Sequence, residues 1–444
     1  MRQTIAGFGN SPRMEAEVTP AAGLRDVSAW LSETQEGLGV GCRQSYGDAC
    51  LSPAVLDMTG MDRFLSFDPA SGELTCEAGV TFRDINRLFV PRGFFPSVTP
   101  GTDKVTLGGA VSADVHGKNH HQAGTFGSHV LDLDLCTPDG RLHTVDPRKG
   151  ADLFRAVVGG MGLLGVITRV RFALRRIPSA YVLQRNFAAG SLRELLALFE
   201  EHAGTPYSLA WIDTRAGDGG LGRGVLTLGE FAQPGELPAR LRSDPFSVRP
   251  LRPITVPFDR PSWLPNPFRM RLLNTLFLEA QRRSPGPQVV DYRAFFYPLE
   301  RVAAWNRLFG KSGLAEYQFV APLDSAATCL EAVLRAVQES GLGTFIAGLK
   351  LFGPENGHYL SFPLRGYTLG MDFPRPPALE PLLDRLDALV LDHGGRLYLA
   401  KDSRMSLAMF RQGYPRLDDF LAVKAAVDPH GRLHSLQSRR LQHG

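Results

Sequence analysis

The chain has 444 residues, of which 43% are hydrophobic and 21% charged, a composition typical of a globular enzyme with two or three domains. Its net charge of +4 is too small to indicate nucleic-acid binding. No run of about 18 apolar residues indicates a membrane span, and the N-terminus lacks the apolar run of a signal peptide. The five cysteines are scattered without metal-ligand spacing, so we expect free thiols, a reducing cytoplasmic compartment and no metal site.

Residues 1 to about 180 alternate short β-rich runs with glycine- and aspartate-containing turns. The runs 74–80 and 166–174 predict strands. A helix is predicted from the N-cap Thr81 to Gly93, and the run 151–160 predicts a second helix that Gly159 and Gly160 close.

The stretch from Pro100 to His121, PGTDKVTLGGAVSADVHGKNHH, combines glycines with a cluster of histidines. Glycine lets the backbone approach a ligand closely and offer its N–H groups. Histidine supplies hydrogen bonds or protons near neutral pH. The pattern predicts a cofactor cradle with a polar reacting end. The alternative is a glycine-rich core segment whose histidines are buried and hydrogen-bonded.

The segment Gly160 to Gly165, GMGLLG, matches G-x-G-x-x-G. A dinucleotide fingerprint follows a strand and opens a helix, whereas here a predicted helix precedes the motif and a β-branched run follows it. We therefore reject an NAD site. Two interpretations stay open, close backbone packing or a second wall of the cofactor site, and packing is favoured for Gly165.

Residues 181 to about 395 alternate helical patterns with strand-like ones. The helical patterns are SLRELLALFEEHAG and DSAATCLEAVLRAVQESG, and the strand-like ones include EYQFVAPL and YTLGMDF. This alternation predicts an α+β unit with an antiparallel sheet. Within it, the segment from Pro245 to Pro287 is rich in proline and arginine, with interleaved apolar residues.

Three blocks of sequence occur together: VGCRQSYGD over 40–48, the stretch 100–129 with HGKNHH and GTFGSHV, and a tail from Gly395 with GRLYLAKDSR. Together they resemble the FAD-dependent oxidoreductases of the vanillyl-alcohol oxidase type. The resemblance covers nearly the whole chain and is weakest between about 180 and 290. It implies a two-domain α+β flavoprotein: an FAD-binding domain over 1–180, a substrate-binding domain over 181–395 with an antiparallel sheet flanked by helices, and a C-terminal return to the FAD-binding domain over 396–444.

The resemblance implies a set of FAD-binding residues: Gly41, Arg43, Gln44, Ser45, Tyr46, Gly101, Gly108, Gly109, Ser112, Gly117, Asn119, Gly124 and Tyr398. Arg43 stands where the family has glycine, and such a position disfavours a side chain if φ is positive. Gln44 stands where the family has arginine, so a swap of positions would keep one cation near the phosphates. Covalently flavinylated relatives have histidine at the Gln44 position, so we expect FAD to be bound non-covalently.

The resemblance implies that Lys401, in AKDSR, and His116 are catalytic. A lysine there would stabilise negative charge on the reduced flavin, with Asp402 and Arg404 holding it. For His120 and His121 a structural role is at least as well supported. The substrate side would carry Tyr297, Glu316, Gln318, Lys350, Thr368 and Gly370. Glu316, Thr368 and Gly370 replace a family glutamine, asparagine and cysteine, so Glu316 would alter selectivity or add a base.

The function implied is oxidation of a secondary sugar hydroxyl, the 2-hydroxyl of a polyprenyl-phosphorylated ribose or related pentose. The 2-keto product would pass to a short-chain reductase partner in an epimerisation that makes arabinose donors for cell-wall polymers. The alternative is a polyol or aldonolactone oxidase that produces hydrogen peroxide. The segment from Pro245 to Pro287 would then be a mobile lip in peripheral contact with an anionic membrane.

Overall fold

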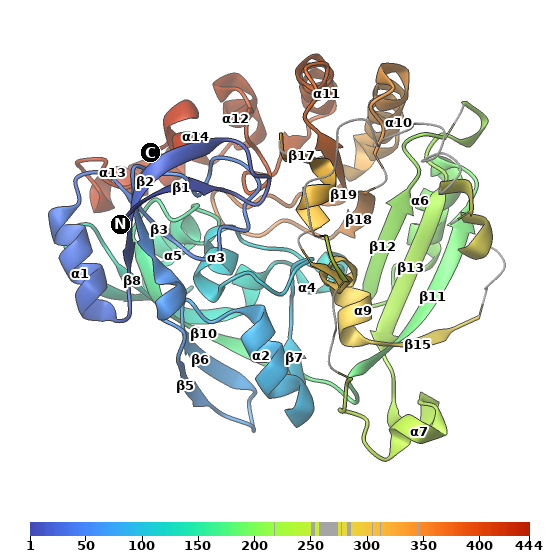
Figure 1. Ribbon diagram of the computed structural model, residues 1–444, viewed down its shortest axis with the longest axis horizontal. Coiled ribbons are helices and arrows are strands. Elements are labelled where there is room, and N and C mark those ends of the chain that lie inside the picture. The colour runs from blue at the N-terminus through green and yellow to red at the C-terminus, as the bar shows by residue number, and fades with distance from the viewer. Residues whose placement is uncertain are drawn as a thin grey trace.

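The computed structural model describes residues 1–216, 218–249, 254–256, 274–276, 278–281, 286–303, 305–310, 312–344 and 346–444. The described strands form a four-stranded, a six-stranded and an eight-stranded sheet and one two-stranded pair. Figure 1 shows the N- and C-termini beside each other, on the opposite side of the molecule from the strands β11 to β13 of the eight-stranded sheet.

The four-stranded sheet has the order β1 (Arg2–Ala6), β2 (Arg13–Pro20), β4 (Ala54–Asp57) and β3 (Leu38–Val40). β1 is antiparallel to β2, and the other pairs are parallel. The helix α1 (Leu24–Glu33) connects β2 to β3 and buries Val27, Trp30 and Leu31 at helical spacing. These side chains join a core cluster with Leu56 of β4, so the helix is held by its apolar face.

The six-stranded sheet is antiparallel and centres on the long strand β10. Its strands are β5 (Phe64–Phe67), β6 (Glu73–Glu77), β10 (Val166–Arg176), β8 (Val130–Cys136) and β9 (Leu142–Val145), with β7 (Phe94–Pro96) paired to the end of β10. The helices of this region are α2 (Phe82–Phe89), α3 (Leu107–Ser112), α4 (His120–Ala123) and α5 (Ala151–Val157).

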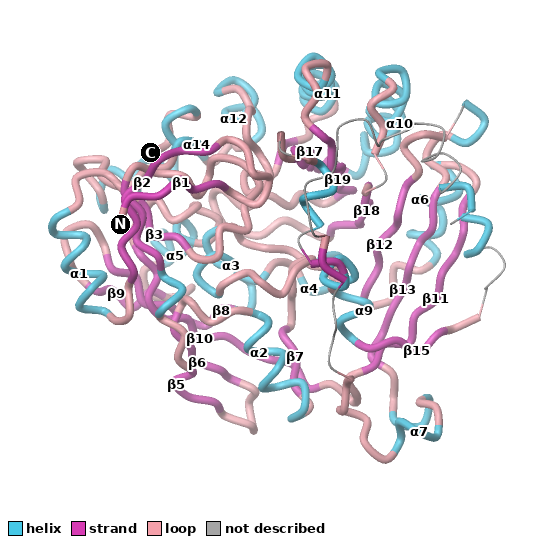
Figure 2. The backbone as a smooth tube through the Cα atoms, in the orientation of Figure 1, coloured by secondary structure: helices cyan, strands magenta, loops and turns pink. Residues whose placement is uncertain are grey.

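The eight-stranded sheet is antiparallel throughout, as expected for this part of the chain. Its order is β15 (Gln288–Asp291), β11 (Tyr181–Ala189), β13 (Gly224–Phe231), β12 (Tyr207–Ile212), β18 (Ala347–Phe352), β19 (Gly366–Pro374), β17 (Leu314–Pro322) and β20 (Arg396–Leu397). Figure 2 shows β11, β12 and β13 running side by side. Because β20 pairs with β17, this sheet takes in the first residues of the C-terminal segment that starts at 396.

The longer described helices that pack against the eight-stranded sheet are α6 (Leu192–Glu201), α10 (Leu323–Ser340) and α11 (Leu379–Asp392). α10 buries an apolar stripe against β17 and β19 and ends at Gly341 in the left-handed conformation. On β17, the Tyr317 hydroxyl donates to Asp387 of α11 at 3.0 Å. Alternation along the strand therefore turns Glu316 and Gln318 to the opposite face, as expected.

The remaining described elements join these sheets or cover them. They are α7 (Ala239–Arg242), α9 (Tyr292–Phe296), the parallel pair β14 (Ile254–Thr255) and β16 (Val302–Ala303), and the C-terminal helices α12 (Leu407–Gly413), α13 (Leu417–Val427) and α14 (Leu436–Arg440). We call the four- and six-stranded sheets with their loops the first lobe, and the eight-stranded sheet with its helices the second. The C-terminal helix is tied to the first lobe because Arg440 bonds both Asp48, in the loop after β3, and Asp402. No helix within the described ranges is long and apolar enough to cross a membrane.

The expected strands 74–80 and 166–174 and the helix capped by Thr81 are confirmed as β6, β10 and α2. The helix expected over 151–160 is α5, which ends at Val157 with Val158 already extended. Gly159, at φ = 83°, and Gly160, whose N–H donates to the Val157 carbonyl oxygen at 3.1 Å, form the turn that follows. The GMGLLG motif lies between α5 and β10, the inverted context that excluded an NAD site. A Cβ on Gly165 would lie 2.7 Å from the Cys136 carbonyl oxygen, so this glycine serves close packing.

The five cysteines are free thiols, as expected. Much of the segment from Pro245 to Pro287 lies outside the described residues. This includes all of the apolar residues on which the membrane-contact expectation depends: Trp263, Leu264, Phe268, Leu272, Leu273 and Phe277.

Candidate active site

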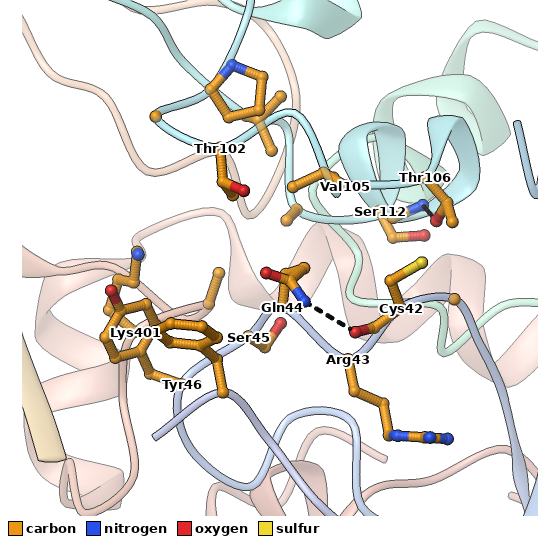
Figure 3. Close-up of a pocket in the computed structure, with 18 of the residues that line it drawn as sticks. Cys42, Arg43, Gln44, Ser45, Tyr46, Thr102, Val105, Thr106, Ser112 and Lys401 are labelled. Carbon is orange, nitrogen blue, oxygen red and sulfur yellow. Dashed lines mark hydrogen bonds between the residues drawn. The ribbon is translucent and has the colours of Figure 1, made fainter. Parts of the chain in front are cut away.

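A cavity of about 380 Å³ lies between the glycine-rich loops of the first lobe and the inner face of the eight-stranded sheet. It is lined from both lobes, by residues within the ranges 38–50, 99–118, 161–167, 296–300, 316–318, 346–350, 370–372 and 398–401. The side of the cavity shown in Figure 3 sets the loop Cys42–Tyr46 opposite the segment Thr102–Ser112. Most of the sequence blocks that carried the family resemblance therefore meet in one place.

The first lobe supplies a narrow, glycine-lined part of the cavity. A Cβ on Gly41 would lie 2.2 Å from Thr106 Oγ1, and one on Gly117 would lie 2.9 Å from the Thr99 carbonyl oxygen. Neither backbone can accept a side chain without a shift. Met161 and Gly162 of the GMGLLG motif also line this region, so that motif provides both backbone packing and a wall of the cavity.

Arg43 adopts φ = 49°, the left-handed conformation that its side chain disfavours. The loop therefore keeps a glycine-like backbone despite the arginine. Figure 3 shows the Arg43 side chain extending away from Thr106 and Ser112, and its Nη1 is buried without a hydrogen-bond partner among the described residues. The exchange of cations between positions 43 and 44 stays a prediction. Gln44 donates to the Cys42 carbonyl oxygen at 3.0 Å.

Lys401 lies on the wall opposite the narrow part, in the turn after β20. Its Nζ is 2.6 Å from Glu316 Oε2 and 3.8 Å from the centroid of the Tyr46 ring, beside which Figure 3 shows it. Tyr46 N donates to the Ala400 carbonyl oxygen at 3.0 Å. The loop of the first lobe and the lysine turn are therefore fixed to each other by backbone.

Asp402 anchors the lysine turn from behind. Its Oδ2 accepts from Arg440 at 2.7 Å, and its Oδ1 accepts from the backbone N–H groups of Arg404 and Met405. Arg404 itself pairs with carboxylates of α11. The support expected from Asp402 and Arg404 is therefore present in the geometry.

Asp372 is a buried carboxyl group in the cavity lining that the sequence analysis missed. It pairs directly with Glu316 across β17 and β19, and its Oδ1 is buried without a hydrogen-bond partner in the described chain. Burial raises the pKa of Asp372 well above its ordinary value, and the Glu316 charge raises it further against the opposing effect of Lys401. Asp372 could have been found from the sequence, because strand alternation places it on the same face of β19 as Gly370, which was expected in the site.

His116 and Gln318 form a hydrogen-bonded pair in the cavity lining. Gln318 Nε2 lies 3.1 Å from His116 Nε2 and 3.2 Å from Thr368 Oγ1. An amide nitrogen only donates, so His116 Nε2 accepts and Nδ1 carries the imidazole proton. That Nδ1 is buried without a partner among the described residues. Burial lowers the pKa of His116 well below its ordinary value, helped by the charges of Lys350, His120 and Lys401.

Two further lysines line the same cavity. Burial, with the charge of Lys350, lowers the pKa of Lys118 to about 7. Burial also lowers the pKa of Lys350 to about 8, although the charge of Glu316 opposes this. Lys118 donates to the Phe295 carbonyl oxygen and lies 4.5 Å from the centroid of that ring. An anionic ligand would stabilise both ammonium groups.

The structure brings most of the expected site residues into the lining: Gly41, Arg43, Gln44, Ser45, Tyr46, Gly101, Gly108, Gly109, Ser112, Gly117, Tyr398, His116, Lys401, Glu316, Gln318, Lys350 and Gly370. Lining residues that the sequence analysis did not assign to the site include Thr106, Lys118 and Asp372.

Four expected residues lie outside the lining. Tyr297 is buried with its hydroxyl bonded to Asn86 and Thr99, at 2.9 and 2.5 Å. Asn119 donates to the Ser97 carbonyl oxygen at 2.8 Å, and Gly124 ends α4 with φ = 68°. Thr368 acts indirectly, by accepting from Gln318. His120 and His121 bond backbone groups, which agrees with a structural role.

Comparison with known proteins adds independent evidence. Residues 24–146 match the model of an FAD binding domain family. A decaprenylphosphoryl-β-D-ribose oxidase of Mycolicibacterium smegmatis is 34% identical over 448 residues, covering 99% of this chain and 97% of that protein. An L-gulono-1,4-lactone dehydrogenase of Mycobacterium tuberculosis is 25% identical and covers 94% of this chain and 93% of its own. An L-gulonolactone oxidase of Mus musculus is 29% identical over 44% of each chain.

The glycine-lined cavity, the half-buried lysine beside a carboxylate and the matched domain define an FAD-dependent oxidoreductase that acts on CH–OH groups. The chain belongs to the family of FAD-linked oxidoreductases that includes the decaprenylphosphoryl-β-D-ribose oxidases.

The residues present fit FAD. The matched range 24–146 contains both the Gly41 loop and the Gly101–Gly117 segment. A Cβ on Gly101 would meet nothing within 4 Å, so the backbone there is open to a ligand, whereas Gly41 and Gly117 pack closely against Thr106 and Thr99. At the other end, His116 Nδ1 and Asp372 Oδ1 are polar atoms without partners in the described chain, and both belong to residues of the same lining. An elongated cofactor with a polar reacting end suits this combination.

Proposed function

We propose that this enzyme oxidises a secondary hydroxyl of a phosphorylated pentose, the 2-hydroxyl of a polyprenylphosphoryl ribose or a close relative, to a 2-keto sugar. The observation that carries the proposal is the pair of half-buried lysines, Lys118 and Lys350, in the same cavity lining as the Glu316–Lys401 ion pair of the reacting end. Neutral sugars and lactones offer such a pair hydroxyl and carbonyl oxygens but no negative charge, whereas a phosphodiester would meet both positive charges. The likeness to a decaprenylphosphoryl-β-D-ribose oxidase over 99% of the chain supports the same substrate class.

The chain's own residues bind and orient the substrate in this proposal. When bound, FAD supplies the acceptor for two electrons and a hydrogen from the alcohol carbon. Lys401 places a positive charge at the reacting end, held by Glu316 and by the ring of Tyr46. His116 Nδ1–H is a donor aimed into a buried site, and Gln318 fixes its tautomer.

An anaerobic flavin-bleaching screen tests the proposal. The purified holoenzyme is mixed with a short-chain polyprenylphosphoryl-β-D-ribose, free ribose, a polyol or L-gulono-1,4-lactone, and the flavin absorbance is followed. We expect bleaching by the phosphorylated ribose at far lower concentration than by the others. Preferential bleaching by the polyol or the lactone would replace the proposal with its alternative, a peroxide-producing oxidase, which the lactone-acting relatives favour.

Replacing Lys350 separates phosphate recognition from chemistry. Lys350→Met should raise the concentration of phosphorylated ribose needed for half-maximal bleaching about tenfold or more, since charge-assisted hydrogen bonds contribute about 1.5–3 kcal/mol. Lys149→Met, at an exposed position, is the matched control and should behave as wild type. An unchanged concentration dependence in Lys350→Met would show that the phosphate binds elsewhere.

We also infer that FAD is held without a covalent bond, because the Gln44 amide is not a group that links to flavin. Acid or heat denaturation should release all of the flavin into the supernatant. A fluorescent protein band after denaturing electrophoresis would contradict this.

The rest of the proposal concerns the domain arrangement, the partner enzyme and the membrane. The two-lobed arrangement is of the vanillyl-alcohol oxidase type, with the FAD lobe over 1–180, the substrate lobe over 181–395 and a return over 396–444. The keto product would be reduced by a separate short-chain reductase, completing an epimerisation that supplies arabinose for cell-wall polymers. A lipid-linked substrate would bring the protein to the surface of an anionic membrane.

A further inference from the structure

Glu316 and Asp372 form a carboxyl pair on the inner face of the eight-stranded sheet, directly opposite each other on β17 and β19. Three neighbouring segments bring titratable groups to this pair: the C-terminal turn brings Lys401, the loop after β3 brings Tyr46, and β18 brings Lys350. Glu316 forms the ion pair with Lys401. Burial and the negative charge of Glu316 raise the pKa of Asp372 well above its ordinary value.

β19 leaves space for the Glu316 carboxylate at Gly370. A Cβ on Gly370 would lie 3.0 Å from Glu316 Oε1, closer than an ordinary van der Waals contact. The two carboxylate oxygens therefore have different surroundings. Oε2 holds the ammonium of Lys401, and Oε1 occupies the space beside Gly370 in the cavity lining.

We propose that Glu316 is the catalytic base of the oxidation, taking the proton of the substrate hydroxyl onto Oε1 in the space that Gly370 leaves. The proposal rests on the reaction class, oxidation of a CH–OH group by FAD, and does not depend on which sugar is bound. The carbon gives its hydrogen with two electrons to oxidised FAD, the O–H bond breaks, and its electron pair forms the second C–O bond. Glu316 becomes neutral, so Lys401 loses its counterion. The positive charge of Lys401 is then free to stabilise the negative charge that the site has gained.

Other bases in the described lining already have partners or hold their protons. Glu300 pairs with Lys104 and Arg83. His116 Nε2 accepts from the Gln318 amide. Burial and the Glu316 charge raise the pKa of Asp372 well above its ordinary value, which favours its protonated form. Lys118 donates to Phe295, and Lys350, with a pKa of about 8, carries a proton at neutral pH. Burial raises the pKa of Tyr46 and of Cys42, so both keep their protons.

The first test is Glu316→Gln, which keeps the shape and removes the proton-accepting carboxylate. We expect flavin reduction to slow by about 10²–10⁴-fold, the usual contribution of a general base, with FAD content unchanged and the acidic limb of the pH–rate profile lost. The alcohol is whichever compound of the bleaching screen reduces wild type, so failure of the sugar proposal appears in wild type and leaves this comparison intact. A variant within tenfold of wild type, with the acidic limb retained, would show that Glu316 only positions Lys401.

A cavity-forming variant and a double-mutant cycle keep the test specific. Glu316→Ala should be partly rescued by added formate, which fits the vacated space and accepts a proton. Gly370→Ala should slow wild type, because its Cβ displaces Oε1, but should have little further effect in the Glu316→Gln background. Equal slowing of both backgrounds by Gly370→Ala, or no rescue at any formate concentration, would overturn the proposal.

A third readout needs no turnover. If Glu316 is ionised at rest, its charge is part of what raises the pKa of Asp372, so ionising Asp372 destabilises the fold as pH rises. Glu316→Gln should therefore make the alkaline fall of the melting temperature shallower than in wild type. An unchanged or steeper fall would show that Glu316 is not a carboxylate in the resting enzyme.

Discussion

The ammonium of Lys401 is held between the Glu316 carboxylate and the Tyr46 ring, so its replacement removes charge from a formed site. Lys401→Met keeps most of the apolar stem and should retain FAD while flavin reduction falls by about 10²–10³-fold, as for removal of one charge-stabilising group. Stopped-flow reduction under anaerobic conditions measures this, with FAD content from the absorbance as the control. His116→Ala should cost less, since His116 contributes a hydrogen bond. A reversed order would contradict the assigned roles.

Asp372 gives the resting protein a pH dependence whose sign follows from its raised pKa. The protonated acid stabilises the fold below its ordinary pKa of about 4, and this contribution is lost as pH rises towards the raised value in the folded protein. Asp372→Asn cannot ionise. Its melting temperature relative to wild type should therefore increase as the pH is raised from about 5 to about 9.

The control for Asp372→Asn is Asp62→Asn, at an exposed position, whose difference from wild type should not change with pH. If Asp372→Asn behaved in the same way, Asp372 would be ionised in the folded enzyme, and the account of the carboxyl pair would fail.

Single residues were predictable where the family resemblance placed them. Lys401, His116, Glu316 and Lys350 were expected in the site, and all line the cavity. Tyr297 was expected there as well, but its hydroxyl bonds Asn86 and Thr99 because the chain turns at the end of α9. Its position depends on a turn geometry that residue type does not specify.

At the scale of elements, the junction between the loop after β3 and the C-terminal turn depends on one glycine. A Cβ on Gly47 would lie 2.0 Å from the Asp402 carbonyl oxygen. Gly47→Ala should therefore cost about 1–3 kcal/mol of stability, as overpacking does, and should loosen both Tyr46 and Lys401. We expect a lower melting temperature and weaker FAD retention on dilution.

Gly204→Ala is the matched control for Gly47→Ala, because its Cβ would meet nothing within 4 Å. It should leave melting temperature and FAD retention close to wild type. Equal effects of the two substitutions would mean that the junction does not hold the site together.

Hydrophobic periodicity predicted β6, β10, β17 and the helix α10 because each carries a clear apolar face. It did not predict which residues pair across strands. The juxtaposition of Glu316 and Asp372 arises from the register of β17 with β19, which joins segments separated by a helix and another strand. Asp372 was missed for that reason, although the alternation of side chains along the strand places it on the same face as Gly370.

For the whole molecule, the sequence predicted an α+β flavoprotein and the glycine-rich cradle. The close contact of Gly41 with Thr106 joins two loops that are far apart in the chain. It could therefore be recognised only in the folded structure. The same holds for the cavity itself, since its two walls come from different sheets. Family resemblance located the reacting end, and the geometry showed which groups share it.

The central claim is that this cavity removes hydrogen from carbon 2 of a phosphorylated ribose. The most direct measurement is the rate of anaerobic flavin bleaching by a short-chain polyprenylphosphoryl-β-D-ribose carrying deuterium at carbon 2, with the carbon 3 deuterated compound as its control. The account predicts slower bleaching with deuterium at carbon 2 only, and a product two mass units lighter than the unlabelled substrate. Bleaching that is slowed only by deuterium at carbon 3, or no bleaching by the phosphorylated ribose at all, would contradict it.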